Sequence, residues 1–384
     1  MSQIPTLPFR WKIILFFFLS VVVVSCSPSP GEIKIGVLAP LSGDFAETSG
    51  QPMVNAVQLA VDQVNEAGGV TVNGRPYEIV LVIEDDATTP ETAVSAAQKL
   101  INQDEVLAII GPPFSSVAIP VAEVAEQAGV PMISPTSTNP QTTLDKTFVF
   151  RATFVDDFQG AAMSRFTLED LGLKRAAVLY DIADTYNRGL AENFQASFTA
   201  AGGEIVAFES YTTDENEDFS AQLGVIAAAE PEALFLPNNT DDVLLQAEQA
   251  RALGIEATFL GGDSWEGERL MGQEPFVDSY FSGHFCRDNS IDAVRVFNEQ
   301  FESAYGREPN GLIALSYDSA GLLFAAMQTQ TELSSQSVRD GLYAVKYSGV
   351  TGEISFSDSG DPVKSVAIWR IERESRGCYQ LVNP

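Results

Sequence analysis

The chain has 384 residues, of which 45% are apolar, which is enough for two domains with separate cores. With 52 acidic and 22 basic residues its net charge is −30, which argues against nucleic acid as a partner because such a surface repels phosphates. A single histidine, His284, and three cysteines without a CxxC pair argue against a metal site. The GxxxxGK[ST] and GxSxG motifs are also missing, so we expect no cofactor and no enzyme activity.

The N-terminus carries export signals. Two basic residues precede the run IILFFFLSVVVV at 13–24, which is too short for a membrane span and typical of a signal-peptide core. The run leads to Cys26, which follows a serine and precedes SPSPG, a pattern that resembles the bacterial lipobox. We predict a lipoprotein signal peptide over 1–25 and a linker over 26–32, with Cys26 lipidated and anchored to a membrane on the periplasmic or cell-surface side. The alternative is an ordinary signal peptide that ends near a cysteine.

Export also makes a disulfide permissible. With Cys26 lipidated, Cys286 and Cys378 are the remaining pair of cysteines. The sequence does not place their sulfur atoms, so it leaves open whether they are joined.

After the linker, short apolar runs alternate with longer stretches of 3.6-residue periodicity. The runs predict strands at 33–39, 78–84, 106–111, 131–134, 176–180, 204–208, 233–237 and 258–262. The periodic stretches predict helices at 49–67, 90–103, 116–128, 156–171, 186–201, 217–229 and 242–253. This alternation predicts parallel sheets with helices on both faces.

The alternation breaks once, near 139–157, where no helix separates two successive units. Helices are predicted later at 290–306, 312–330 and 335–345, followed by short strands near 353–357, 364–371 and 378–382. We therefore predict an α/β fold of two Rossmann-like doubly wound lobes joined by a three-segment hinge. The predicted parts are lobe 1 (33–154 plus 285–363), lobe 2 (155–284 plus 364–384) and hinge segments near 152–157, 284–288 and 361–365.

Polar loops recur in both halves of the chain. In each half, two such loops follow neighbouring predicted strands, which places them at the carboxyl edge where open α/β sheets bind ligands. The candidate residues are Ser115, Ser116, Thr136, Ser137 and Thr138 in the first half and Asn239 and Asp263 in the second.

The two loop pairs differ in chemistry. Ser115 and Ser116 precede a predicted helix, whose N-terminus favours a carboxylate. Asp263 is a natural partner for an ammonium group. Taken singly, a serine here is explained as a helix N-cap and Asp263 as a solvated loop carboxylate. Taken together, facing lobes of this chemistry predict a receptor for a zwitterion.

Several motifs carry a family resemblance. They are IKIGVLAPLSG at 33–43, IIGPPFSS at 109–116, GVPMISPTST at 129–138, VLYDIADTYNRG at 178–189 and TFLGGDSW at 258–265. In their order and spacing, the chain resembles the type I periplasmic binding proteins, and more narrowly the leucine/isoleucine/valine-binding branch that serves ABC transporters. The resemblance implies a monomer that captures an amino acid, branched-chain or otherwise neutral, between two closing lobes and delivers it to transporter membrane subunits.

The resemblance also implies roles for single residues. Ser115 would meet the ligand carboxylate, and the loop of Thr136, Ser137 and Thr138 would hold its α-amino and carboxylate groups. Tyr186 would close over the ligand, and Asp263 would take the ammonium.

Three positions depart from the family pattern. Asn239 stands where the family has a second tyrosine, Phe114 replaces a cysteine, and Phe45 only lies near the expected first-loop aromatic position. These departures affect the side-chain pocket, where an acid-lined rim could favour a polar side chain over leucine. Because proteins of this fold differ in ligand and in role, the alternatives are a urea, short-amide or aromatic-acid ligand, or a ligand sensor.

Other polar or aromatic residues near the predicted site have structural interpretations. We expect His284 to make a structural hydrogen bond, and Asp156 and Asp157 to make polar contacts in the hinge region. Trp265 either lines the pocket or packs its own loop.

Overall fold

The computed structural model describes residues 1–3, 31–212, 218–266, 269–270, 272–289, 291–356, 358–373 and 376–383. Nearly all of the predicted signal peptide, and the predicted lipidation site Cys26, lie outside the described residues. Within the described ranges, no helix combines the length and apolarity needed to cross a membrane.

The first sheet has six strands in the order β2-β3-β1-β4-β5-β6. Their bounds are β1 Gly31–Ala39, β2 Val70–Val72, β3 Arg75–Asp85, β4 Ala108–Ile110, β5 Met132–Ser134 and β6 Val149–Arg151. Neighbouring strands pair in parallel except at one edge, where β2 is antiparallel to β3.

Helices cover both faces of the first sheet, as the alternating pattern predicts. One face packs against α1 (Gln51–Glu66), α9 (Gly311–Gln328) and α10 (Ser335–Ala344). The other packs against α2 (Pro90–Asn102) and α3 (Ser115–Ala128). Distant parts of the chain therefore build this lobe together, because α9 and α10 come after strands β7 to β11 of the second sheet in the sequence.

The second sheet has seven strands in the order β15-β14-β11-β10-β9-β7-β8. Their bounds are β7 Arg175–Asp181, β8 Glu204–Tyr211, β9 Ala233–Leu236, β10 Thr258–Gly261, β11 Tyr280–Gly283, β14 Val366–Ile371 and β15 Arg376–Val382. The helices α4 (Asp156–Arg165) and α5 (Thr185–Ala200) cover one face, and α6 (Ser220–Ala228) and α7 (Thr240–Ala252) cover the other. The last two strands, β14 and β15, pair antiparallel, so the second sheet, like the first, departs from the predicted parallel pairing at one edge.

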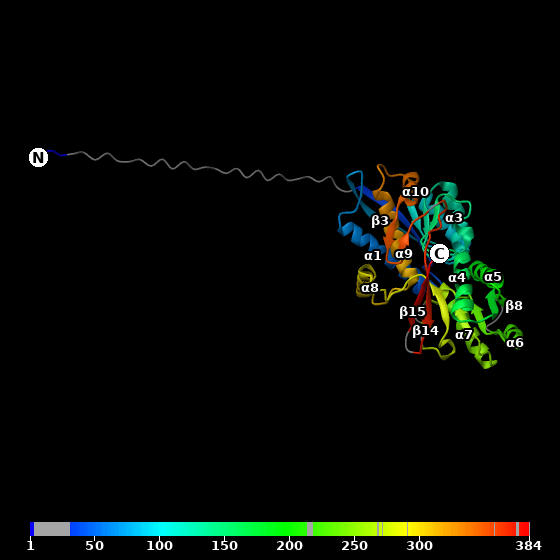
Figure 1. The fold of residues 1–384 in the computed structure, drawn as a ribbon. Helices are drawn as coiled ribbons and strands as arrows, with labels where there is room; N and C mark the ends of the chain where they lie inside the picture. The colour runs from blue at the N-terminus through cyan, green and yellow to red at the C-terminus, as the bar shows by residue number, and fades with distance from the viewer. Residues whose placement is uncertain are drawn as a thin grey trace.

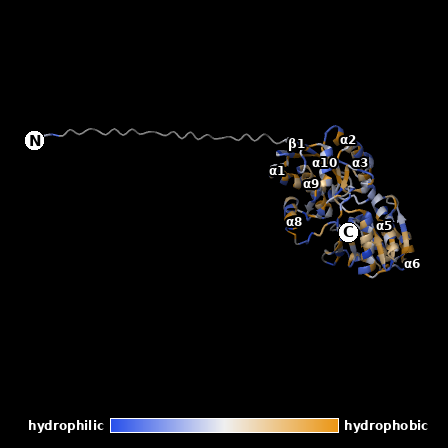
Figure 2. Cartoon of the chain, turned by 45° about the horizontal axis from the view of Figure 1, so that its top comes forward, coloured by the Kyte–Doolittle hydropathy of each residue, from blue (hydrophilic) through white to orange (hydrophobic). Residues whose placement is uncertain are grey.

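Apolar strand residues hold each lobe together. Val178 of β7 and Phe235 of β9 are fully buried, and the ring of Phe194 on α5 stacks on Phe235 with centroids 4.2 Å apart. In Figure 2 hydrophobic residues gather on the strands, as expected for sheets buried on both faces.

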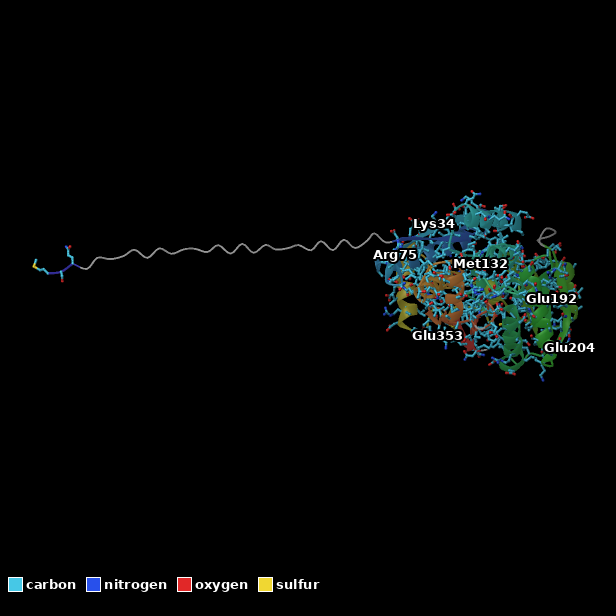
Figure 3. All side chains as sticks on the ribbon, turned by 90° about the horizontal axis from the view of Figure 1, so that it is seen from above. Lys34, Arg75, Met132, Glu192, Glu204 and Glu353 are labelled. Atoms are coloured by element: carbon cyan, nitrogen blue, oxygen red, sulfur yellow. A yellow bond between two sulfur atoms is a disulfide. The ribbon has the colours of Figure 1, made fainter. Side chains whose placement is uncertain are left out.

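The two lobes lie end to end. Figure 1 shows the elements of the first sheet in the upper part of the molecule and those of the second in the lower part. Seen from above in Figure 3, Lys34 and Arg75 lie toward one end, Glu192 and Glu204 toward the other, and the buried Met132 between them.

The chain passes between the lobes three times: after β6, after β11 and before β14. The crossing segments contact one another, because Thr153 Oγ1 lies 3.1 Å from His284 Nδ1 and Arg151 Nε lies 2.7 Å from Asp361 Oδ1. After the second crossing come α8 (Asp292–Tyr305) and, after α10, the hairpin of β12 (Tyr347–Gly349) and β13 (Gly352–Ile354). A disulfide joins Cys286, in the second crossing, to Cys378 on β15.

Candidate functional site

A cavity of about 370 Å³ lies between the lobes. Most of its wall residues lie in loops that follow β1, β3, β4 and β5 in the first sheet and β7, β9, β10 and β11 in the second, so the carboxyl edges of both sheets face it. The remaining wall residues lie within 307–312, around the start of α9. Six predicted site residues line it: Ser115, Ser116, Thr136, Tyr186, Asn239 and Asp263.

The first-lobe wall is built on the start of α3. Phe114 is the N-cap residue, so Ser115 and Ser116 occupy the first two helical positions and the N-cap interpretation of these serines is wrong. Backbone N–H groups in the first helical turn lack helical partners, and with the helix dipole they favour an anion. This wall therefore suits a carboxylate.

Hydroxyl groups tie the two loops of this wall together. Ser115 Oγ accepts from the Ser137 hydroxyl at 3.0 Å, and the Thr136 hydroxyl donates to the carbonyl oxygen of Pro113 at 2.9 Å. Ser137 and Thr138 are fully buried and lie behind the wall rather than on it. The carbonyl oxygen of Thr138 accepts from the backbone N–H of Asp156 at 2.9 Å, which connects this loop to the first crossing segment.

A buried arginine supports the same loop from behind. Arg151 donates through Nη1 to the carbonyl oxygen of Ser137 at 2.6 Å and through Nη2 to that of Asn139 at 2.9 Å. Nη2 also bonds Thr143 Oγ1 at 2.7 Å, while Nε pairs with Asp361 in the third crossing. Burial lowers the pKa of this guanidinium and Asp361 opposes that shift. Arg151 thus fixes the loop and ties it to the hinge.

The second-lobe wall centres on Asp263, the first residue of a short 3₁₀ helix, Asp263–Trp265. Its Oδ1 accepts from Gln159 Nε2 at 2.7 Å and from the Tyr186 hydroxyl at 2.8 Å, and its Oδ2 lies 2.9 Å from His284 Nε2. Burial raises the pKa of Asp263, but the charge of His284 and the three hydrogen bonds outweigh it and lower the pKa. The cavity therefore presents an ionised carboxylate on this side.

Two glycines make this arrangement possible. A Cβ at Gly262 would lie 2.4 Å from the Tyr186 hydroxyl oxygen, and one at Gly261 would lie 2.1 Å from the Trp265 ring. Trp265 is fully buried and its Nε1 donates to the carbonyl oxygen of Leu236 at 3.0 Å. Trp265 consequently packs the loop instead of lining the cavity.

Two predicted residues of this wall lie at helix starts. Tyr186 is in the first turn of α5, whose N-cap Asp184 accepts from the backbone N–H of Asn187 at 2.9 Å. Burial and the neighbouring Asp263 raise the pKa of Tyr186 well above its ordinary range, so it stays a hydrogen-bond donor. Asn239 is the N-cap residue of α7, makes no side-chain cap bond and lines the cavity.

The outer part of the cavity mixes apolar and charged side chains. Phe45 packs on Phe114 with ring centroids 4.8 Å apart, and Leu312 extends this apolar side. Charged residues on the rim are Asp44, Asp241, Glu266, Arg269, Arg307 and Glu308. Two of these acids are in ion pairs, Asp241 with Arg269 and Glu308 with Arg287.

Sequence reasoning missed His284 and Gln159 as parts of the site. His284 directly follows β11, a strand that was not predicted, so the rule that ligands meet the ends of strands could not be applied to it. Gln159 lies on α4 and reaches Asp263 only through tertiary packing, for which the sequence holds no signal.

A second buried acid lies close to this wall. Asp156 begins α4 in the hinge region and is fully buried, whereas its neighbour Asp157 is exposed. Burial raises the pKa of Asp156 to about 8, opposed by the nearby Thr138 side chain and reinforced by the charge of Asp263. Asp156 does not line the cavity. At neutral pH it is therefore a protonated carboxyl group that lies behind the ionised Asp263.

Comparisons with known proteins agree with this architecture. The family model described as periplasmic binding protein matches residues 32–376. An amino acid binding protein of Pseudomonas aeruginosa is 33% identical over 319 residues, which cover 82% of this chain and 83% of that protein.

Two solved structures are similar along nearly their whole length. The leucine binding protein LivK of Thermotoga maritima has a TM-score of 0.84 at 31% identity, covering 92% of this chain and 99% of that one. The branched-chain amino acid transporter substrate binding protein LivJ of Streptococcus pneumoniae, in complex with isoleucine, has a TM-score of 0.83 at 30% identity. The match covers 92% of this chain and 100% of that one. These are solute-binding proteins and not enzymes. The chain belongs to the periplasmic binding protein family, in its branch of branched-chain amino acid ABC transporter substrate-binding proteins.

Proposed function

We propose that the protein captures a neutral L-amino acid, with a branched-chain side chain as the first candidate, and presents it to the membrane subunits of an ABC transporter. The observation that carries this proposal is the opposition of two walls across one cavity. Asp263 is complementary to an ammonium group, and the start of α3 with Ser115 and Thr136 is complementary to a carboxylate.

The names of similar proteins support the same ligand class. LivK is described as leucine binding, and LivJ was solved with isoleucine. The apolar side formed by Phe45, Phe114 and Leu312 offers a surface on which an aliphatic side chain could be buried.

Closure about the hinge would complete the site. A ligand that touches both lobes binds the closed form more tightly and shifts the population toward it. The contacts of Thr153 with His284 and of Arg151 with Asp361 support the proposed hinge segments near 152–157, 284–288 and 361–365. The transporter would then bind the closed form.

The cellular setting is part of the proposal. It comprises export, a lipid anchor at Cys26 on the periplasmic or cell-surface side of a membrane, and a monomeric working state. The sequence patterns support the first two and the family resemblance supports the third. A polar ligand, such as urea, a short amide or an aromatic acid, is the second candidate. It is favoured by the charged rim and by Asn239, where the family has a tyrosine.

A thermal-shift screen of the purified protein tests the ligand class directly. Ligand at 100 times its dissociation constant adds about 2.7 kcal/mol to the stability, which amounts to a shift of several degrees. We expect shifts with leucine, isoleucine or valine. A response confined to urea, amides or aromatic acids would replace the proposal with the second candidate.

A further inference from the structure

His284, the only histidine of the chain, lies in the cavity wall between the acid and the hinge. Its Nε2 is 2.9 Å from Asp263 Oδ2, and its Nδ1 is 3.1 Å from Thr153 Oγ1 in the first crossing segment. The side chain is 2% exposed, and its ring lies 4.3 Å from the ring of Phe154. The imidazole is therefore fixed on both nitrogens and on one face.

We propose that His284 is the positioning residue of the amino-group site, and that the charge state of its ring sets the affinity for a ligand ammonium. This inference rests on the proposed amino-acid ligand. A carboxylate offers about four acceptor positions. Gln159, Tyr186 and His284 occupy three on Asp263, so one remains for a donor from the ligand.

Both protonation states of the ring fit this geometry. In the neutral ring with the proton on Nε2, His284 donates to Asp263 and accepts the Thr153 hydroxyl proton at Nδ1. When the ring is protonated, the Thr153 hydroxyl turns and accepts from Nδ1, because a hydroxyl serves in either role. The two states therefore differ mainly in the charge placed beside Asp263.

That charge decides how strongly Asp263 attracts an ammonium. Among the described residues, His284 is the only side chain in an ion pair with Asp263. When the imidazole is neutral, the negative charge of Asp263 is free to attract the ligand ammonium. An imidazolium compensates that negative charge and repels the ligand ammonium. Affinity is thus expected to fall when acid converts the ring to the imidazolium.

Other ionisable groups face the same cluster from neighbouring elements. Tyr186 on α5 stays protonated, and burial raises the pKa of Asp156 on α4 to about 8, with Arg151 opposing that shift. On the far side, Glu266 Oε1 lies 3.1 Å from the Cβ position of Gly283, next to His284. Because Asp156 also gains negative charge as pH rises, only a variant that removes the imidazole isolates the effect of His284.

The test is calorimetry of L-leucine binding to the wild-type protein and to His284→Gln, which keeps a donor but cannot become charged. Between about pH 7.5 and pH 5.5, we expect wild-type affinity to fall about tenfold or more and that of the variant to fall less than about threefold. Asp156→Asn is the control and should keep the wild-type pH dependence in this range. An equal fall in wild type and His284→Gln would overturn the proposal.

A second measurement needs neither ligand nor variant. Because the chain has one histidine, a long-range ¹H–¹⁵N spectrum of protein without a histidine tag reports a single pair of ring nitrogens. We expect the neutral ring to carry its proton on Nε2, and a proton on Nδ1 instead would overturn the proposal. If leucine failed to bind at every pH, the proposed ligand would be wrong, while this spectrum would still decide the pairing with Asp263.

Discussion

The two walls of the cavity reach complementary charge by different means. The first-lobe wall is assembled from neutral parts, a helix start and hydroxyls such as Ser115 and Thr136, with the buried Arg151 behind them. The second-lobe wall depends on one ionised side chain, Asp263, held by three donors. The difference teaches that the first wall spreads recognition over several modest contacts, whereas the second concentrates it in one group.

The largest expected effect on stability comes from removing Arg151, which supports the first-lobe wall from behind. Arg151→Met deletes a buried guanidinium that bonds two carbonyl groups and Asp361, so we expect a loss of about 3–5 kcal/mol in the free energy of unfolding. Arg295→Met removes exposed helix pairs with Asp292 and Glu299 and is the matched control, with little expected change. Similar denaturation midpoints for the two variants would show that Arg151 does not support the wall.

Removing the charge of the second wall should have the largest effect on binding. Asp263→Asn keeps the shape of the side chain but leaves the ligand ammonium without an anion, at an expected cost of about 2–5 kcal/mol in leucine affinity. Asp241→Asn is the control, because this acid lines the same cavity but is exposed and paired with Arg269. Calorimetry that gave both variants the same leucine affinity would refute the role of Asp263.

A single contact of the first wall should matter less. Ser115→Ala removes one hydroxyl beside the start of α3, and a hydrogen bond to a charged group contributes about 1.5–3 kcal/mol. Ser95→Ala, on the exposed side of α2, is the control and should leave leucine affinity unchanged. A loss for Ser115→Ala as large as that for Asp263→Asn would contradict the contrast between distributed and concentrated recognition.

The last prediction concerns stability, at Asp156, the protonated acid behind the second-lobe wall. Burial raises the pKa of Asp156 from 3.8 to about 8, so between these values the folded state holds a proton that the unfolded state releases. Stability contributed by this group is therefore lost as pH rises through that window. We expect Asp156→Asn to raise the melting temperature more at about pH 8 than at about pH 5.

The control for this effect is its neighbour. Asp157→Asn changes an exposed side chain and should leave the melting temperature nearly unchanged at both pH values. An equal gain for Asp156→Asn at the two pH values would mean that the folded protein does not hold the extra proton.

Most helices could be predicted because their periodicity is long and their ends are marked by residues such as Gly129, which adopts a left-handed conformation after α3. The strands β6 and β11 were missed because polar residues interrupt their apolar runs, VFR and YFSG. Because β11 was not predicted, His284 at its end was not recognised as a site residue. The sequence also could not tell which hydroxyls face the cavity, because turn geometry places Thr136 on the wall and Ser137 behind it.

The opposition of an ammonium site and a carboxylate site can be tested with three ligands of the same hydrocarbon skeleton. Calorimetry would compare L-leucine with isocaproate, which lacks the amino group, and isoamylamine, which lacks the carboxylate. Two charged contacts across the cavity predict that leucine binds and that each analogue binds at least about 100-fold more weakly. If isocaproate bound as tightly as leucine, the role assigned to Asp263 would be contradicted. If isoamylamine bound as tightly as leucine, the carboxylate-binding role of the first-lobe wall would be contradicted.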